Sequence, residues 1–163
     1  MISVRQASSA DLPAICLLAD EINRQHWRHH PKVFLDPDAE DAVVPSRHSE
    51  FWLQAIDDRE GAVLMALAAQ RVVGFVTARI MPQPEIPFLT GRRVCRIGTI
   101  VVRTSLHGQG IGQRLMAAAD GWARQRDVVE MRLEVFDFNR DAMRFYDAAG
   151  FAVQSHILTR SLD

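Results

Sequence analysis

The chain has 163 residues, of which 48% are hydrophobic and 24% charged, a composition typical of globular proteins that excludes a disordered or fibrous one. Its formal charge of -1 gives no general attraction to nucleic acid or to an anionic membrane, so we expect neither partner. Cys16 and Cys95 form neither a disulfide framework nor a zinc-ligand pattern, and no run of about 18 apolar residues predicts a membrane span. We therefore expect one cytoplasmic domain over residues 1–163.

The first half of the sequence divides into six segments according to its local pattern. They are a strand over 1–6, a helix over 12–23, a loop over 26–49, a short helix over 49–57, and a hairpin of strands over 62–69 and 72–80. Ser8, Ser9 and Asp11 are N-cap candidates for the first helix. Prolines interrupt the loop, which we expect to face a substrate. Gly74 indicates a bulge or a close backbone approach.

The second half predicts a unit in which a helix connects two parallel strands. Its segments are a loop over 82–91, a strand buried on both faces over 93–103, a glycine-rich turn, a helix over 111–126, a strand over 128–135, a helix over 139–149 and a last strand over 151–162. Strand, tight turn, helix and strand in succession form a βαβ unit. The whole chain therefore predicts an α/β fold with a mixed central sheet flanked by helices.

Three glycines at alternate positions, Gly108, Gly110 and Gly112, lie between the buried strand and the helix. Glycine lets the backbone turn tightly and approach a ligand, and the free N–H groups of a helix start bind anions such as a pyrophosphate. A nucleotide-hydrolysing P-loop would need Gly-Lys followed by Ser or Thr, and a dinucleotide fingerprint would need a glycine in place of Gln113. The loop therefore predicts a different phosphate-bearing cofactor.

The segment over 102–112 resembles the acyl-CoA-binding motif of the GNAT superfamily of N-acyltransferases, with His107 where that motif has Arg or Gln. A second segment, over 139–151, is similar to another motif of this family, in which Asn is followed by Ala, then by Phe-Tyr and then by Gly-Phe. The two motifs have the order and separation of the family, and the resemblance covers essentially the whole chain. It implies a GNAT-like fold whose central strands splay apart at the acetyl-CoA site.

The resemblance also implies where acetyl-CoA, the cosubstrate, would bind. The strand main chain would pair with the pantetheine arm and the acetyl carbonyl, and the loop amides would bind the pyrophosphate. Asn139 would contact the pantetheine, and Tyr146 would lie beside the sulfur. A neutral imidazole at His107 supplies less positive charge than arginine, so we expect weaker cofactor binding. The cofactor-binding residues implied are Ile100, Val101, Val102, His107, Gly108, Gln109, Gly110, Ile111, Gly112, Gln113, Asn139 and Tyr146.

Acetyl transfer to an amine needs a deprotonated amine, donors for the oxyanion and a proton for the departing thiolate. Tyr146 is the expected catalytic proton donor, because it is the only tyrosine and a phenol has a pKa of about 10, close to that of an aliphatic thiol. The alternative for Tyr146 is a packed aromatic side chain. The base stays open, since the strand over 93–103 has no acidic residue. The alternatives are Glu21, His26, Glu85, Glu134 and a water held by strand carbonyls.

Two further chemistries are disfavoured by their sequence context. His26, His29 and His30 share a helical face, but Pro31 follows at once and no carboxylate completes a ligand set, so we expect no metal. Cys95 lies among arginines that could activate a thiol, but free cysteines are usually inert core residues. We therefore expect direct attack on acetyl-CoA in a ternary complex.

The expected function is an N-acetyltransferase that acts on a primary amine. The alternative is an inactive acyl-CoA-binding sensor or interaction module on the same scaffold. It is motivated by His107 and by the lack of an acidic residue in the strand over 93–103, where many relatives in the similar family use a glutamate as the base. The acceptor is a small-molecule or peptide amine; peptide N-termini, lysines, polyamines, amino acids and aminoglycosides stay open. We expect its pocket in the loops over 26–49 and 82–91, with Trp27 or Trp52 as further lining residues. Relatives are often homodimers, but the sequence leaves the oligomeric state open.

Overall fold

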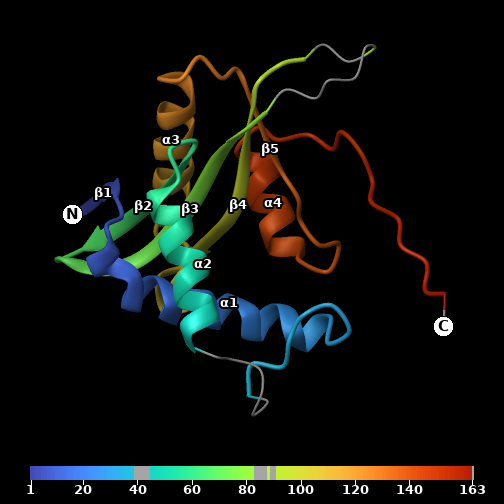
Figure 1. Ribbon diagram of the computed structural model, residues 1–163, viewed down its shortest axis with the longest axis horizontal. Coiled ribbons are helices and arrows are strands. Elements are labelled where there is room, and N and C mark those ends of the chain that lie inside the picture. The colour runs from blue at the N-terminus through green and yellow to red at the C-terminus, as the bar shows by residue number, and fades with distance from the viewer. Residues whose placement is uncertain (39–44, 83–87, 89–90, 163) are drawn as a thin grey trace.

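The computed structural model describes residues 1–38, 45–82, 88 and 91–162 and shows an α/β fold. The described residues form a five-stranded sheet in the order β1-β2-β3-β4-β5, antiparallel except for the β4–β5 pair. Helices cover both faces of this sheet, as expected (Figure 1). The strands are β1 Ile2–Gln6, β2 Gly61–Ala68, β3 Arg71–Met81, β4 Val94–Val102 and β5 Glu130–Leu133, and the helices are α1 Leu12–His29, α2 Pro45–Asp57, α3 Ile111–Arg124 and α4 Arg140–Ala148.

Two separate groups of apolar side chains bury the sheet. Alternate residues of β2 point to opposite faces, so Leu64 packs with α3 residues while Met65 packs with residues of α1 and α2. The prediction that β4 is buried on both faces is wrong at Arg96 and Gly98, which are exposed. The helices leave this part of β4 uncovered, and it borders the groove described below.

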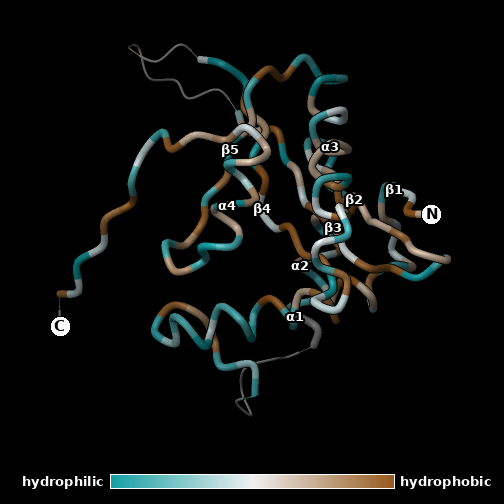
Figure 2. The backbone as a smooth tube through the Cα atoms, turned by 180° about the vertical axis from the view of Figure 1, so that it is seen from behind, coloured by the Kyte–Doolittle hydropathy of each residue, from teal (hydrophilic) through white to brown (hydrophobic). Residues whose placement is uncertain are grey.

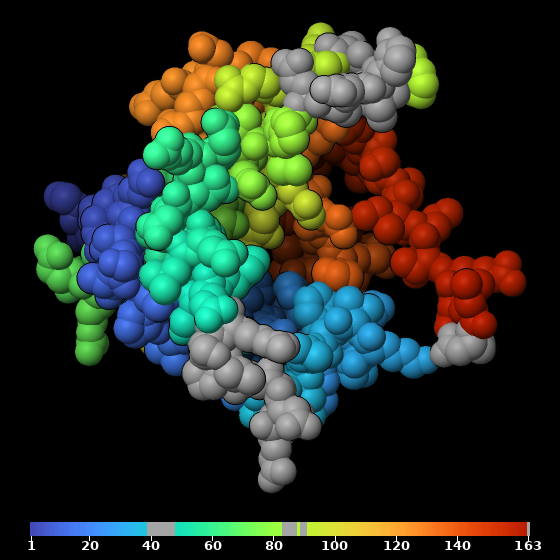
Figure 3. Space-filling view, viewed as in Figure 1, coloured from blue at the N-terminus to red at the C-terminus, as the bar shows by residue number. Residues whose placement is uncertain are grey.

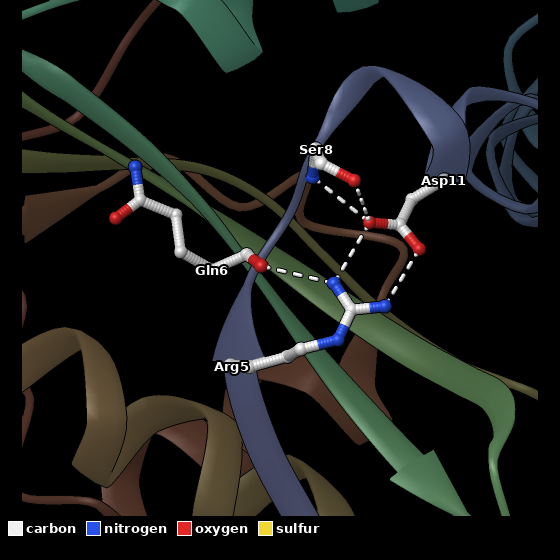
Figure 4. A network of polar contacts seen from close by, with 4 residues as sticks. All are labelled: Arg5, Gln6, Ser8 and Asp11. Atoms are coloured by element: carbon white, nitrogen blue, oxygen red, sulfur yellow. Dashed lines mark hydrogen bonds and ion pairs between the residues drawn. The ribbon is translucent and has the colours of Figure 1, made fainter.

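The entrance to α1 is fixed by a polar network that joins it to β1 (Figure 4). Asp11 accepts two hydrogen bonds of 2.8 Å from the Arg5 guanidinium and one of 2.8 Å from the Ser8 main-chain N–H. The hydrogen bond from Arg5 is the largest cause that holds the pKa of Asp11 well below its ordinary value. Ser8 and Asp11 therefore form the N-terminal cap expected from the sequence, around a 3-10 turn over Ser9–Asp11.

Two helices are longer than their sequence patterns indicate. The apolar repeat predicts a helix that ends at Asn23, but α1 continues to His29. The last turns of α1 pack on aromatic side chains outside the core, so they do not carry the apolar repeat from which a helix is recognised. The second begins at Pro45 rather than at Ser49, and proline is well suited to a first helical position. None of the helices in the described ranges combines the length and apolarity needed to cross a lipid bilayer.

The predicted hairpin is confirmed, and Gly74 has both of the features expected of it. The register of β2 against β3 shifts beside Gly74, because Ala66 faces Gly74 while Leu67 faces Val72. A Cβ on Gly74 would lie 2.5 Å from the main-chain oxygen of Val101. Only glycine allows β3 and β4 to approach this closely, so Gly74 positions the end of β4.

The βαβ unit is also confirmed, with β4 and β5 parallel, but the strand predicted over 128–135 is shorter. The two strands pair from Val94 with Glu130 to Ile97 with Leu133. Beyond this point β4 continues to Val102, whereas β5 has ended. Beyond Ile97, the edge of β4 that faces β5 therefore has no strand partner. This separation of the two strands is the splay that the resemblance implies.

The last strand, predicted over 151–162, does not form in this structure. After α4 the chain runs outward, away from the rest of the molecule, and it is exposed from residue 152 to residue 162 (Figures 1 and 3). A strand is defined by its hydrogen-bonded partner, and this segment pairs with none of the described strands.

Candidate active site

The glycine loop has the backbone geometry that its sequence predicts. Gly108 and Gly110 have φ angles of 77° and 74°, in the left-handed region that other residues avoid. Gly110 is the N-cap of α3, and the first intrahelical bond runs from the Arg114 N–H to the Gly110 oxygen at 3.1 Å. The N–H groups of the preceding first-turn residues have no intrahelical acceptor and carry the positive end of the helix dipole.

The space beside this loop fits a phosphate group. A Cβ added to Gly108 would meet no atom within 4 Å, and one added to Gly110 would meet only the Gln113 side chain, at 3.5 Å. The main chain here is therefore accessible to a ligand. Backbone N–H groups, a helix N-terminus and open space together suit the pyrophosphate of an acyl-CoA.

His107 has a specific partner that the sequence did not reveal. Its Nε2 lies 2.8 Å from the Val102 carbonyl oxygen. A carbonyl oxygen only accepts, so Nε2 carries the hydrogen and donates it. The imidazole thus links the glycine loop to the end of β4. From the sequence, His107 is expected only to bind the cofactor more weakly than an arginine would.

At the open edge of β4, the main-chain N–H groups of every second residue have no strand partner. The N–H of Thr99 donates to Thr77 Oγ1 at 2.8 Å and the N–H of Arg103 donates to the Val73 oxygen at 2.8 Å, both toward β3. Because the direction of N–H groups alternates along a strand, those of Ile100 and Val102 point to the other edge, where β5 is absent. The amide of Val101, also expected to contact the cofactor, faces β3 instead.

Helix α4 brings the second motif to this edge. Asn139 is its N-cap, and its Oδ1 accepts a hydrogen bond of 3.2 Å from the Ala142 N–H, which leaves the side-chain NH₂ for other acceptors. Tyr146 is half-buried and packs with its neighbour Phe145 at a centroid distance of 5.3 Å. Burial raises the pKa of the Tyr146 phenol above its ordinary value, so the hydroxyl is protonated at neutral pH.

These parts of the site share one group of packed side chains. Ile100 and Val102 of β4, Leu133 of β5 and Tyr146 of α4 all lie against the same buried core between the sheet and α3. The structure therefore packs the end of β4, the start of α3 at Ile111 and the Tyr146 side chain of α4 against one core.

An open groove of about 910 Å³ lies on the α2 side of the sheet, where Figure 3 shows the surface hollowed between α2 and β4. The strands contribute Thr77, Gly98 and Thr99 to its lining. Carboxylate and amide side chains line it from α2 and the turn that follows: Glu50, Gln54, Asp57 and Asp58. Asp58 forms an ion pair of 2.9 Å with Arg79.

The sequence interpretation did not predict this groove; it expected the acceptor pocket in the loops over 26–49 and 82–91. The groove is lined by α2, by the turn that follows it and by strands β2 to β4, and it includes Trp52 but not Trp27. Residues 39–44, 83–87 and 89–90 of those loops lie outside the described residues. The spacing of Glu50, Gln54 and Asp57 at i, i+4 and i+7 is the signal that could have identified this polar helix face.

The four side-chain candidates for a base lie in different places. Glu134 directly follows β5, and its carboxylate lies 3.9 Å from Nη2 of the groove residue Arg96. Glu21 is on α1, and His26 is packed among aromatic rings. Glu85 lies outside the described residues. Of the described candidates, only Glu134 contacts a residue of the groove.

The three histidines at the end of α1 form an aromatic cluster with three phenylalanines rather than a metal site. The closest stacked pair is His29 with Phe138, at 4.6 Å between centroids. The described residues contain no group of three or more His, Cys, Asp or Glu placed to hold a metal ion. Burial, and secondarily the charge of His29, lower the pKa of the half-buried His26. The cluster consists of His26, His29, His30, Phe34, Phe136 and Phe138.

Cys95 does not have the environment of a nucleophile. It is fully buried in β4, and burial raises the pKa of its thiol. A reactive cysteine needs the opposite shift and access to solvent. The nearby arginines therefore do not activate it.

Comparison with known proteins agrees with this geometry. The model of the acetyltransferase (GNAT) family matches residues 19–151. The chain is 28% identical over 153 residues to the aminoglycoside N(6')-acetyltransferase type 1 of Stenotrophomonas maltophilia, covering 91% of this chain and 85% of that protein.

Solved structures show that the fold is shared. A tetramutant of the BH1408 protein from Bacillus halodurans superimposes with a TM-score of 0.87 at 22% identity, covering 98% of this chain and 99% of that one. The aminoglycoside N-acetyltransferase AAC(6')-Iy in complex with CoA superimposes with a TM-score of 0.74 at 20% identity, covering 99% and 94%. The chain therefore belongs to the GNAT family of acetyltransferases, enzymes that transfer an acetyl group to an amine.

Proposed function

We propose that this enzyme transfers the acetyl group of acetyl-CoA directly to a small-molecule amine bound in the groove between α2 and the sheet. One observation carries the proposal: Thr99 lines the groove, and the next residue, Ile100, presents its N–H at the open edge of β4. Consecutive residues of a strand are about 3.3 Å apart along its axis. Acceptor and acyl donor would thus meet on β4, with no need for an enzyme-bound acyl group.

The residues present fit acetyl-CoA, which supplies the thioester when it is bound. The loop amides from Gly108 to Gln113 would bind the pyrophosphate, while Ile100, Val102 and the Asn139 NH₂ would bind the pantetheine. The similar AAC(6')-Iy has been solved with CoA and with a CoA-linked acetylneamine analogue, the latter at a TM-score of 0.76 and 19% identity. Those complexes support a site that accepts CoA and an amine acceptor together.

Tyr146 is proposed to hold the proton that the departing thiolate needs. Its raised pKa keeps a hydrogen on Oη across the neutral range, and it packs against the same core as Ile100 and Val102. Glu134, or a water held by strand carbonyls, is proposed to take the proton of the amine. Glu134 is favoured among the side chains because it reaches Arg96 in the groove.

The acceptor is proposed to be a small molecule with more than one amine. Glu50 and Asp57 line the groove from one helix face and attract cationic groups, whereas Asp58 is already paired with Arg79, which also lines the groove. An aminoglycoside or a polyamine has this chemistry, whereas a single amino acid brings its own carboxylate. The 28% identical relative, which is an aminoglycoside N(6')-acetyltransferase, supports the aminoglycoside choice.

We also propose that the enzyme acts in the cytoplasm. Cys16 and Cys95 are both free thiols, as is usual in a reducing compartment.

A thiol-release assay over four amine classes tests the proposed function: aminoglycosides, polyamines, amino acids and peptides. Release of CoA is expected to depend on the amine and to be fastest with the polycationic classes. Glu50→Gln and Asp57→Asn should each raise KM for such an amine several-fold, because attraction between charges is lost. Glu60→Gln, an acid outside this groove, is the control. Tight acetyl-CoA binding without amine-dependent release would instead favour the sensor.

A further inference from the structure

The pairing of β3 with β4 is irregular at one place, beside the groove. The register shifts there by one residue, so that Thr77 of β3 lies opposite two residues of β4, Gly98 and Thr99. The two strands lie side by side in both views of the chain (Figures 1 and 2). This arrangement is a β-bulge, and the extra residue of a bulge loses its regular main-chain partner. All three residues line the groove.

The Thr77 side chain supplies the partner that the bulge takes away. Its Oγ1 accepts a hydrogen bond of 2.8 Å from the Thr99 N–H, in a partly buried position. In a regular antiparallel pair, the acceptor of such an N–H group is a main-chain carbonyl of the neighbouring strand. An N–H group that is shielded from water and has no acceptor costs free energy, so the Thr77 hydroxyl stabilises the bulge.

Gly98 is fitted to the same hydroxyl. A Cβ at residue 98 would lie 2.9 Å from Thr77 Oγ1, which is closer than such atoms approach in proteins. The backbone of Gly98 is not in the left-handed region, so its φ angle does not require glycine. A side chain at residue 98 would instead force the Thr77 hydroxyl away from the Thr99 N–H. The glycine therefore preserves this hydrogen bond.

The bulge decides which main-chain groups of β4 reach the open edge. Successive N–H groups of a strand point to opposite edges, and one inserted residue reverses this order for the residues that follow. Because the Thr99 N–H is held toward β3, the Ile100 N–H points to the open edge. Loss of the hydrogen bond to Thr77 frees the Thr99 N–H to turn, and the direction of the Ile100 N–H is then no longer fixed.

We propose that Thr77 is a positioning residue for acetyl transfer, whose hydroxyl holds the bulge of β4 in the form that directs the Ile100 N–H toward the acyl donor. The inference rests on the proposed function, in which that N–H binds the acyl donor at the open edge of β4. Thr77 acts through the main chain and takes no proton itself. Loosening the bulge should therefore slow acetyl transfer without weakening the binding of the pyrophosphate at the glycine loop.

Steady-state kinetics of two substitutions at one position test this role. Thr77→Val keeps the shape of the side chain but has no hydroxyl, and it should lower kcat for thiol release about tenfold. Its dissociation constant for CoA should change by less than about twofold, because the glycine loop is untouched. Thr77→Ser keeps Oγ1 and should retain most of the wild-type kcat. Thr159→Val, the same substitution in an exposed segment, is the control.

Hydrogen exchange of the wild-type protein tests the contact without any substitution. The Thr99 amide should exchange on the order of a hundredfold more slowly than in an unstructured peptide, and Thr77→Ser should keep this protection. An unprotected Thr99 amide in the wild type overturns the proposal, even if Thr77→Val does not fold.

A double-substitution cycle tests the fit between Gly98 and Thr77. Gly98→Ala should lower kcat about tenfold in the wild type, because its Cβ displaces the Thr77 hydroxyl. In Thr77→Ala, which has no hydroxyl to displace, the same change should have little further effect. Equal losses in the two backgrounds would contradict the proposal.

The kinetic outcomes separate this inference from the proposed function. A wild type that releases no CoA with any amine class overturns the proposed function, and this inference with it. An active wild type with an unchanged kcat in folded Thr77→Val, or with equal losses in Thr77→Val and Thr77→Ser, overturns this inference alone.

Discussion

Gly112 in the first turn of α3 lies directly against the ring of Phe145 in α4: a Cβ at residue 112 would be 3.2 Å from Cε2 and 3.3 Å from Cζ of that ring. This contact sets the distance between the glycine loop and the helix that carries Asn139 and Tyr146. The third glycine of the loop, Gly112, thus allows α3 and α4 to pack closely, while Gly108 and Gly110 adopt the left-handed backbone of the turn.

Gly112→Ala should push the Phe145 ring and α4 away from α3. We expect a several-fold loss of kcat/KM for acetyl-CoA, because Tyr146 follows Phe145 in the same helix. Gly121→Ala is the matched control: Gly121 is also in α3, and a Cβ there would meet no atom within 4 Å. The control should keep wild-type kinetics and gain about 0.5–1 kcal/mol of unfolding free energy. Identical kinetics in both variants would contradict the packing role.

Gly110→Val should abolish tight acetyl-CoA binding. A β-branched residue is strained at a φ of 74°, and its side chain would occupy the space beside the loop amides. Titration calorimetry on the folded variant should give a dissociation constant for acetyl-CoA at least tenfold larger than that of the wild type. Wild-type affinity in a folded Gly110→Val would mean that the pyrophosphate does not bind at this loop.

His107→Ala should weaken acetyl-CoA binding about fivefold, the effect of losing a hydrogen bond of about 1 kcal/mol between the loop and Val102. His107→Gln keeps a donor for the Val102 carbonyl and should retain most of the affinity. Comparing the two dissociation constants by titration calorimetry checks this account. Equal loss in both variants would argue that the ring, and not its hydrogen bond, matters.

Tyr146→Phe should lower kcat about 10- to 100-fold and leave the dissociation constant of acetyl-CoA nearly unchanged, since only the leaving-group proton is lost. Burial raises the pKa of the Tyr146 phenol, so the alkaline fall in wild-type kcat that reports on this group should lie at higher pH than the titration of a free phenol. The variant should lack this fall. An unchanged kcat would remove Tyr146 from the mechanism.

His26 should make the fold less stable in mild acid. Its pKa is lowered in the folded chain, so the unfolded chain binds the proton more tightly. The contribution of neutral His26 is complete above its unfolded pKa of about 6.5 and is lost as the pH falls through that value toward the lowered folded pKa. Around it lie the rings of Phe34, Phe136 and Phe138 and the imidazole of His29.

Urea unfolding at pH 7.5 and 5.5 checks this prediction. The wild-type midpoint should drop more between the two pH values than that of His26→Gln, which has no titrating imidazole. The difference between the two drops isolates His26 from all other titrating groups. A larger drop in the variant would contradict the assigned direction.

The glycine loop, the β4–α3–β5 unit and the α4 motif could be predicted from the sequence because their signals are local. Closely spaced glycines between a strand and a helix favour a tight turn with left-handed backbone, as Gly108 and Gly110 show, and the alternation of apolar residues defines strands and helix faces. The assignment of individual ligand contacts to Ile100, Val102 and Asn139 is a proposal, because a sequence pattern does not show what a side chain or amide binds.

Features that depend on distant partners could not be predicted. The exposure of Arg96 and Gly98 follows from where α2 stops covering β4, and the acceptor groove follows from the meeting of α2 with three strands. The last turns of α1 are held by Phe136 and Phe138, more than a hundred residues away, so their local pattern carried no signal. The segment over 151–162 has strand-forming residues, but no partner for them within the described chain.

The central claim is that acetyl-CoA and an amine meet at β4, and one combined measurement tests it most directly. Acetyl-CoA is titrated into the purified protein by calorimetry, and the same preparation is assayed for thiol release with and without a polycationic amine. The account predicts one saturable binding event and thiol release that requires the amine. Absence of binding, or binding with release that is the same without amine, would contradict it.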